Sequence, residues 1–456
     1  MMRAMRLNVG DDGRDSLRRL LVCLATALLL CFAHVAGSRI MVGICLVLFL
    51  IVVAQGSFRG KTFDVFLFFL PWSPLLKQQV GDISFYTIAL GLACAAALAR
   101  RRFLVKPYQI LLPAILLIVT LAAKLVQGHS VDRGYLLFMA MLVIFPSLVS
   151  DDVPCRASFE QTCLFFAAGI ISAALSAQLV AGHPNIAAFI NVASWAHVTR
   201  LSGYYGDANF YSSQINACIA GLLLILAKES SYLMRGVFIG LLIALLYCGL
   251  LSASKSFVIV GACELCIWIA VLFGRGARKA SNLVLLIAAA ATILFFLSTA
   301  AFQHLLSILD SRFSYAASLS QVTTGRSDVW RNYLDLFTRD PKLLLLGEGY
   351  TDITLQVLRG KASHNTIIQC VFQFGIIGFP VLASWFACLV KDMLPVSLTG
   401  TGNAAKALML VGTFLPWLGL DYLFFDEFFL LPVFVGWGIG CLSDSQLGSS
   451  LQKGQA

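Results

Sequence analysis

The sequence TGRSDVWR, residues 324–331, lies inside a long polar interval that runs from Phe302 to His364. The same interval contains LGEGY at residues 346–350 and closes on SHN at residues 363–365. On both sides the chain returns to apolar runs that are long enough to cross a bilayer. A polar loop of this length between membrane spans is where functional side chains are expected.

The composition of the whole chain is that of a polytopic membrane protein. The chain has 456 residues, of which 59% are hydrophobic and 12% are charged, and its mean hydropathy is +0.85. Soluble domains carry roughly 25% charged residues. We therefore expect an all-α fold with about 12–14 transmembrane helices. The apolar runs lie near residues 17–36, 40–54, 62–76, 83–99, 107–124, 135–150, 159–181, 209–227, 234–252, 255–273, 281–302, 365–390, 404–422 and 427–442.

The distribution of Lys and Arg predicts the orientation. An N-terminus on the cytoplasmic side collects most basic loop residues in the cytoplasm, as the positive-inside rule requires. Eleven runs precede the polar interval, so this interval lies outside the cytoplasm. The predicted organisation is an N-terminal helix bundle (1–302), a large loop with an amphipathic helix (303–364), further transmembrane helices (365–442) and a cytoplasmic tail (443–456), which is polar and expected to be disordered.

Three spans enter the membrane from the side of this loop, and each begins with polar residues. They start near Asn209, Lys255 and Asn365. A helix N-terminus offers free N–H groups and a partial positive charge, which suits a phosphate group. The sequence therefore predicts an anion-binding region where these helices begin.

The loop itself contains a predicted helix from about Ser327 to Thr338, because apolar residues recur there at helical spacing. Thr324 or Ser327 could cap it. Arg326 and Trp330 are four residues apart and share a face, with Arg331 beside them. The alternative is a surface helix whose arginines are merely solvated.

Other candidate residues have equally ordinary alternatives. His364 opens a membrane span after a predicted Ser363 cap and could act as a general base, although a lone histidine is more often structural. Lys255 could bind a phosphate or simply extend to the interface. Asp207 and Asn209 could be only helix caps. Glu264 lies within a span, where ionisable groups are costly and often functional.

Several chemistries have no signature in the chain. There is no Walker A loop, no Gly-x-Gly-x-x-Gly after a strand, no serine nucleophile elbow and no His-rich zinc motif. We therefore expect no metal and no cofactor. An enzyme on the outer face also lacks ATP, so its donor has to arrive already activated.

Four stretches in this order resemble the O-antigen ligase and O-antigen polymerase superfamily of bacterial envelope glycosyltransferases. They are residues 200–209, residues 252–255, residues 324–331 with the glycines at 347–349, and residues 364–365 followed by FGIIG at 374–378. The resemblance implies a GT-C-like membrane glycosyltransferase in the bacterial inner membrane, with its large loop in the periplasm. It covers residues 195–395 most strongly.

The resemblance also implies the substrates and the site residues. The donor would be a glycan on undecaprenyl diphosphate, transferred with inversion to a saccharide or lipid A-core hydroxyl without a metal. Partners would include a flippase and a chain-length regulator. His364 and Arg326 would be catalytic and Arg200, Lys255 and Arg331 would bind the diphosphate; supporting residues would be Asp207, Asn209, Ser254, Trp330 and Asn365.

Three functions stay open at this point. A polymerase of O-antigen or exopolysaccharide repeat units is the first, and a ligase that transfers the finished glycan to lipid A-core or protein is the second. A transporter or flippase, which would use Glu264 to couple ions, is the third; it predicts inverted repeats, which the sequence does not display.

Overall fold

The computed structural model describes residues 2–76, 84–128, 130–131, 133–151, 156–190, 200–227, 232–274, 325–350, 363–393 and 403–453, with isolated positions between 298 and 310. Within these ranges every regular element is a helix: α1 (Met2–Val35), α2 (Arg39–Phe58), α3 (Thr62–Phe69), η1 (Leu70–Leu76), α4 (Phe85–Arg100), α5 (Pro107–Gln127), α6 (Arg133–Asp151), α7 (Arg156–Val180), α8 (Ala187–Ile190), α9 (Ala208–Leu226), α10 (Tyr232–Leu251), α11 (Lys255–Gly274), α15 (Arg326–Arg339), α16 (Pro341–Leu346), α18 (Thr366–Met393), α19 (Asn403–Phe414), η3 (Pro416–Gly419) and α20 (Glu427–Lys453).

Eight of these helices are long and apolar enough to cross a membrane. They lie in α1, α2, α5, α7, α9, α10, α11 and α18. Five shorter apolar helical stretches match other predicted runs: Thr62–Leu76, Phe85–Arg100, Gly134–Val149, Lys406–Gly419 and Glu427–Gly440. The expectation of an all-α, multi-pass membrane protein is therefore confirmed. The predicted run 281–302 lies outside the described residues, apart from Ser298.

Two predicted segments near the C-terminus differ from the structure. The run 404–422 does not continue as one helix, because α19 ends at Phe414 and a short 3₁₀ helix containing Pro416 follows. Proline cannot donate the next helical hydrogen bond. The prediction of a disordered tail from 443 is also wrong as far as Lys453, where α20 ends.

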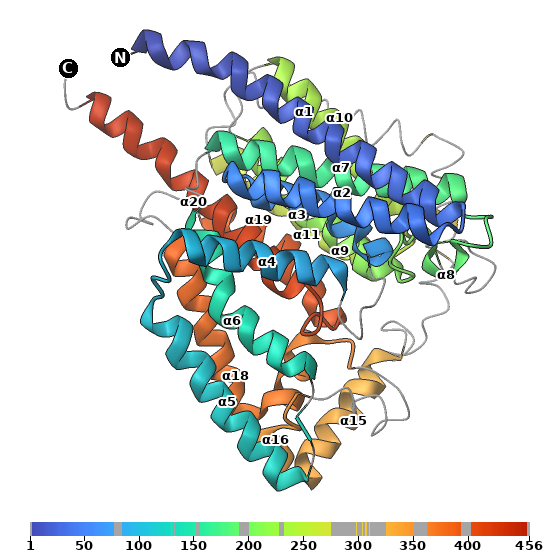
Figure 1. Cartoon of the computed structure of the whole chain (residues 1–456), viewed down its shortest axis with the longest axis vertical. Helices are drawn as coiled ribbons and strands as arrows, with labels where there is room; N and C mark the ends of the chain where they lie inside the picture. The colour runs from blue at the N-terminus through green and yellow to red at the C-terminus, as the bar shows by residue number, and fades with distance from the viewer. Residues whose placement is uncertain are drawn as a thin grey trace.

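Figure 1 shows two groups of helices that meet along the C-terminal part of the chain. One group contains α1, α2, α3, α7, α9, α10, α11 and α19, and the other contains α4, α5, α6 and α18, with α15 and α16 at its far end. α20 packs against α7, α9, α18 and α19 and so joins the two groups. The helix predicted at 327–338 is confirmed as α15.

The loop after α16, which contains Gly347 and Gly349, packs against α18 at Gly375. α18 is interrupted at Gly375, which has φ 66° and ψ 179°. The interruption frees carbonyl groups of α18, and the loop after α16 uses them: Glu348 N–H donates to Phe372 O at 2.8 Å and Gly349 N–H to Gln373 O at 2.9 Å. A Cβ on Gly347 would lie within 2.6 Å of the Gln373 backbone.

We expect Gly375→Ala to destabilise the protein. Its backbone conformation is one that only glycine adopts readily, which costs other residues about 1–3 kcal/mol, and an added Cβ would overlap the Leu345 carbonyl. The unfolding temperature of the purified protein in detergent should fall. Gly261→Ala in α11, where a Cβ meets no atom within 4 Å, is the matched control and should not lower it.

Candidate functional site

The starts of α9 and α11 are joined by a small polar cluster. Asp207 caps α9 by accepting from Asn209 N–H at 2.7 Å. Asn209 Oδ1 in turn accepts from the Ser254 hydroxyl at 2.8 Å and from Arg200 Nη2 at 3.4 Å. Arg200 Nε donates to the Ser252 carbonyl at 3.0 Å. The predicted residues Arg200, Asp207, Asn209 and Ser254 therefore form one connected group.

The start of α18 is fastened to the segment after η3 by Asp421. Its carboxylate accepts from the backbone N–H of His364 at 2.9 Å and of Asn365 at 3.2 Å, and from the Ser363 hydroxyl. Three donors on one carboxylate fix residues 363–365 in space. His364 itself has a left-handed backbone, with φ 48°, which costs a non-glycine residue free energy unless its surroundings impose it.

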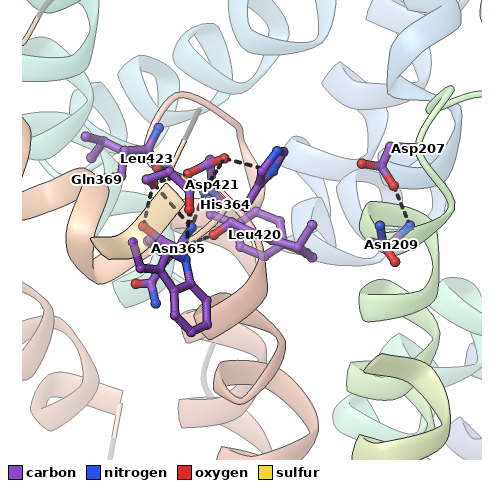
Figure 2. A network of polar contacts seen from close by, with 12 residues as sticks. Asp207, Asn209, His364, Asn365, Gln369, Leu420, Asp421 and Leu423 are labelled. Atoms are coloured by element: carbon purple, nitrogen blue, oxygen red, sulfur yellow. Dashed lines mark hydrogen bonds and ion pairs between the residues drawn. The ribbon is translucent and has the colours of Figure 1, made fainter. Parts of the chain in front are cut away.

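Further bonds extend this attachment along α18, as Figure 2 shows. Thr366 donates to the Leu420 carbonyl at 2.6 Å, and Gln369 accepts from Leu423 N–H at 3.1 Å. Asn365 donates to the Leu418 carbonyl at 3.1 Å. The segment from η3 to α20 is therefore held against the first two turns of α18.

α15 is attached to the start of α18 as well. Trp330 donates its indole N–H to the Ser363 carbonyl at 2.9 Å, so the helix lies next to His364. Val329, Tyr333 and Phe337 form its buried face and pack against Phe372 of α18. These are three of the five apolar residues whose helical spacing predicted α15; of the other two, Trp330 is partly buried and Leu334 is exposed.

Arg326, the first residue of α15, is influenced by a carboxylate from each of the two polar groups. Burial lowers the pKa of its guanidinium, and the negative charges of Asp207 and Asp421 act in the opposite direction. Both carboxylates are therefore close enough to influence the same guanidinium. On its other side Nη1 lies against Gly419, where a Cβ would approach it to 2.8 Å.

The side chain of His364 is 40% exposed and faces Asp421, with 3.4 Å between Nδ1 and Oδ2. Figure 2 shows its ring on the side of Asp421 that faces Asp207 and Asn209. With Nδ1 turned to a carboxylate, Nε2 is the nitrogen left for another group. A carboxylate in this place can orient an imidazole and stabilise its protonated form, as a base requires.

Two predicted residues are less closely tied to the site. Arg331 is exposed, and it is two residues from the buried Val329, so it lies on the outward face of α15. Lys255 is the first residue of α11 and is half-buried. The structure thus groups Arg200, Asp207, Asn209, Ser254, Arg326, Trp330, His364 and Asn365, while Arg331 points elsewhere.

The predicted helix caps are wrong in detail. The N-cap of α15 is Gly325, in a left-handed conformation and without a side-chain cap, so Ser327 does not have that role; Thr324 lies outside the described residues. α18 is capped by Asn365, which accepts from the N–H of Ile367 at 3.0 Å and of Ile368 at 3.1 Å. Ser363 is instead bonded to Asp421.

Asp421 is the residue that the sequence analysis missed. The only signal for it was a carboxylate in an otherwise apolar run, LGLDYLFF at 418–425, where it counted only against a membrane span. In the structure Asp421 is buried. It is the link between His364 and the segment after η3.

We expect Asp421→Asn to destabilise the protein by about 1–3 kcal/mol, because an amide nitrogen would face backbone N–H groups that now donate to a carboxylate. The shift in unfolding temperature in detergent measures this. Asp392→Asn, which removes a partly exposed ion pair with Lys106, is the control and should cost less than about 1 kcal/mol. Equal stability of the two variants would contradict the assigned role of Asp421.

An apolar cavity of about 360 Å³ begins beside this site. Its wall includes Thr366, next to the capping residue Asn365, and Trp417 of η3. From there it follows α18 past Leu382 and Phe386 to Val390. The cavity therefore lies along the membrane-spanning part of α18 and ends close to the polar network.

The described residues contain no group of three His, Cys, Asp or Glu side chains that could hold a metal ion. Neither a protein-family model nor a curated protein sequence matches this chain. The resemblance to the O-antigen ligase and polymerase superfamily thus stands on the motifs themselves.

Proposed function

We propose that this protein is a membrane glycosyltransferase that transfers a glycan from undecaprenyl diphosphate to a sugar hydroxyl, and that it polymerises repeat units of O-antigen or exopolysaccharide. The observation that carries the proposal is the His364–Asp421 pair, with Arg326 lying against Gly419 nearby and under the electrostatic influence of both Asp207 and Asp421. This combination offers one cation for a leaving diphosphate and one base for an incoming hydroxyl.

In the proposed reaction His364 Nε2 takes the proton of the acceptor hydroxyl as its oxygen attacks the anomeric carbon. The bond from that carbon to the diphosphate oxygen breaks, and the sugar inverts. Arg326 stabilises the negative charge that develops on the departing diphosphate. Asp421 stabilises the imidazolium that forms.

The roles of the other basic residues follow from their contacts. Arg200 already uses Nε and Nη2 to hold Ser252 and Asn209, so we assign it chiefly to positioning the starts of α9 and α11. These helix starts supply N–H groups for phosphate oxygens. Lys255 adds a cation at the same end of α11.

The apolar cavity along α18 suits the lipid part of this donor. Its lining is almost entirely apolar and it lies within the membrane-spanning helices, so a prenyl chain would meet no unpaired polar group there. Its volume is that of a small-molecule pocket, so it would take the first isoprene units and leave the rest in the lipid.

Reconstitution of the purified protein with an undecaprenyl-diphosphate-linked repeat unit tests the activity directly. We expect glycans longer than one repeat. The absence of such products would contradict the proposal. The acceptor is tested in a deletion strain: loss of a polymerase leaves lipid A-core with one repeat unit, whereas loss of a ligase leaves bare core and carrier-linked polymer. The proposed membrane placement, with the large loop in the periplasm and about 12–14 spans, is testable by cysteine accessibility.

A further inference from the structure

Three buried polar side chains in the membrane-spanning region are outside the proposed glycosyl-transfer site. Glu264 on α11 and Asn216 on α9 are fully buried, and Thr413 on α19 is 1% exposed. Both carboxylate oxygens of Glu264, both amide atoms of Asn216 and the Thr413 hydroxyl lack a hydrogen-bond partner within the described ranges. Buried groups of this kind are rarely left unpaired in native proteins.

Glu264 and Asn216 lie at the same depth. α9 and α11 begin side by side, joined by Arg200, Asn209 and Ser254. Asn216 is eight residues into α9 and Glu264 is nine residues into α11, which is about 12–14 Å along each helix. Both therefore lie near the middle of a hydrocarbon core about 30 Å thick.

The three helices that carry these residues pack against one another, and Gly412 of α19 lies against both Glu264 and Asn216. A Cβ on Gly412, next to Thr413 in α19, would overlap Glu264 Oε1 and would lie 3.2 Å from the Asn216 carbonyl oxygen. Ser213, one turn before Asn216 on α9, bonds to Tyr422, so this face of α9 is turned toward the chain that leaves α19. Trp268, one turn after Glu264, donates to Leu223 of α9 at 2.8 Å.

Among the described residues, no ion pair balances an ionised Glu264. No Lys, Arg or His forms an ion pair with it in the part of the chain that is described, and the titratable side chain that lies near it is Cys218 of α9. An uncompensated charge at this depth costs several kcal/mol. Oxygen atoms from a carboxylate, an amide and a hydroxyl are the ligands that hard cations prefer.

We propose that Glu264, Asn216 and Thr413 bind one monovalent cation, Na⁺, between α9, α11 and α19. A monovalent ion leaves the site neutral, whereas a divalent ion would leave a net positive charge in the hydrocarbon. The bound ion gives every unpaired oxygen a partner and fixes α19 against α9 and α11. This inference is independent of glycosyl transfer, because none of its three residues belongs to the site at His364.

Two measurements on the full chain in detergent test the site without using enzymatic activity. Na⁺ is expected to raise the unfolding temperature with concentration, because a ligand that binds only the folded state stabilises it. A hydrophobic carbodiimide, which attacks protonated carboxyl groups, should modify Glu264 several-fold more slowly in Na⁺ than in choline at the same ionic strength.

Substitutions of two of the proposed ligands and of a control carboxylate test whether Na⁺ binds at Glu264. Glu264→Gln should abolish the Na⁺-dependent rise in unfolding temperature, and Thr413→Val should weaken it. Glu427→Gln is the matched control, because this buried carboxylate already accepts from Gln214 at 2.9 Å, and it should keep the Na⁺ response. An unfolding temperature that does not change with Na⁺, or a response that survives in Glu264→Gln, would overturn the proposal; a carbodiimide reaction unaffected by Na⁺ would mean that Glu264 holds only a proton.

Discussion

His364→Ala is expected to lower the rate of glycosidic bond formation by about 10²–10⁴-fold, the contribution typical of a positioned general base. The imidazole is partly exposed and lies 3.4 Å from Asp421, so its loss removes the proton acceptor without opening the core. The rate of polymer formation by reconstituted protein measures the effect. In cells the same change should leave only single repeat units on the glycan profile.

The interpretation depends on the protein remaining folded. His364 has a left-handed backbone, so His364→Asn, a residue that tolerates this conformation, is the second variant. It should have the unfolding temperature of the wild type and remain inactive. A His364→Asn variant with wild-type activity would remove this residue from the chemistry.

Arg326→Ala is expected to lower the same rate by about 10²–10³-fold, because a preorganised cation at the leaving group acts mainly on the transition state. Arg326→Lys keeps the charge and should recover part of the activity, but it loses the planar fork that can hold two phosphate oxygens at once. The rate at saturating donor concentration separates this effect from weaker binding.

Arg339→Ala provides the control for Arg326. Arg339 is exposed in the last turn of the same helix, so its removal changes the net charge of α15 equally but leaves the site intact. We expect near-wild-type activity. Equal losses in the two variants would mean that the loop acts through its overall charge and that Arg326 has no specific role.

The sequence predicted the elements whose formation depends on local pattern. Long apolar runs identified the membrane helices, and apolar residues at helical spacing identified α15 with its buried face of Val329, Tyr333 and Phe337. Grouping by membrane side also predicted that Arg200, Arg326 and His364 would lie at one end of the bundle. That argument needed only topology, because helices that start on the same side expose their first turns to the same compartment.

Details that depend on tertiary contacts were not predictable. In the sequence, Asp421 was only a charge that did not fit a membrane span. Its role was not visible there because its three donors come from residues 363–365, which are distant in sequence. Asn365 caps α18 in place of Ser363 because Asp421 draws the serine hydroxyl away. The unpaired state of Asn216 and Thr413 likewise depends on how three helices pack, so the sequence had singled out Glu264 alone.

The double attachment of α15 has a kinetic consequence. One of its ends is tied to Ser363 through Trp330, and the loop that follows α16 is hydrogen-bonded to the interrupted α18. Because α15 is attached at both places, we expect the guanidinium of Arg326 to keep its position without a movement of the helix before each turnover. In the proposed reaction we therefore expect no hinge motion of α15 to limit turnover, so that membrane fluidity, through lateral diffusion of the lipid-linked donor, has the larger effect on the rate.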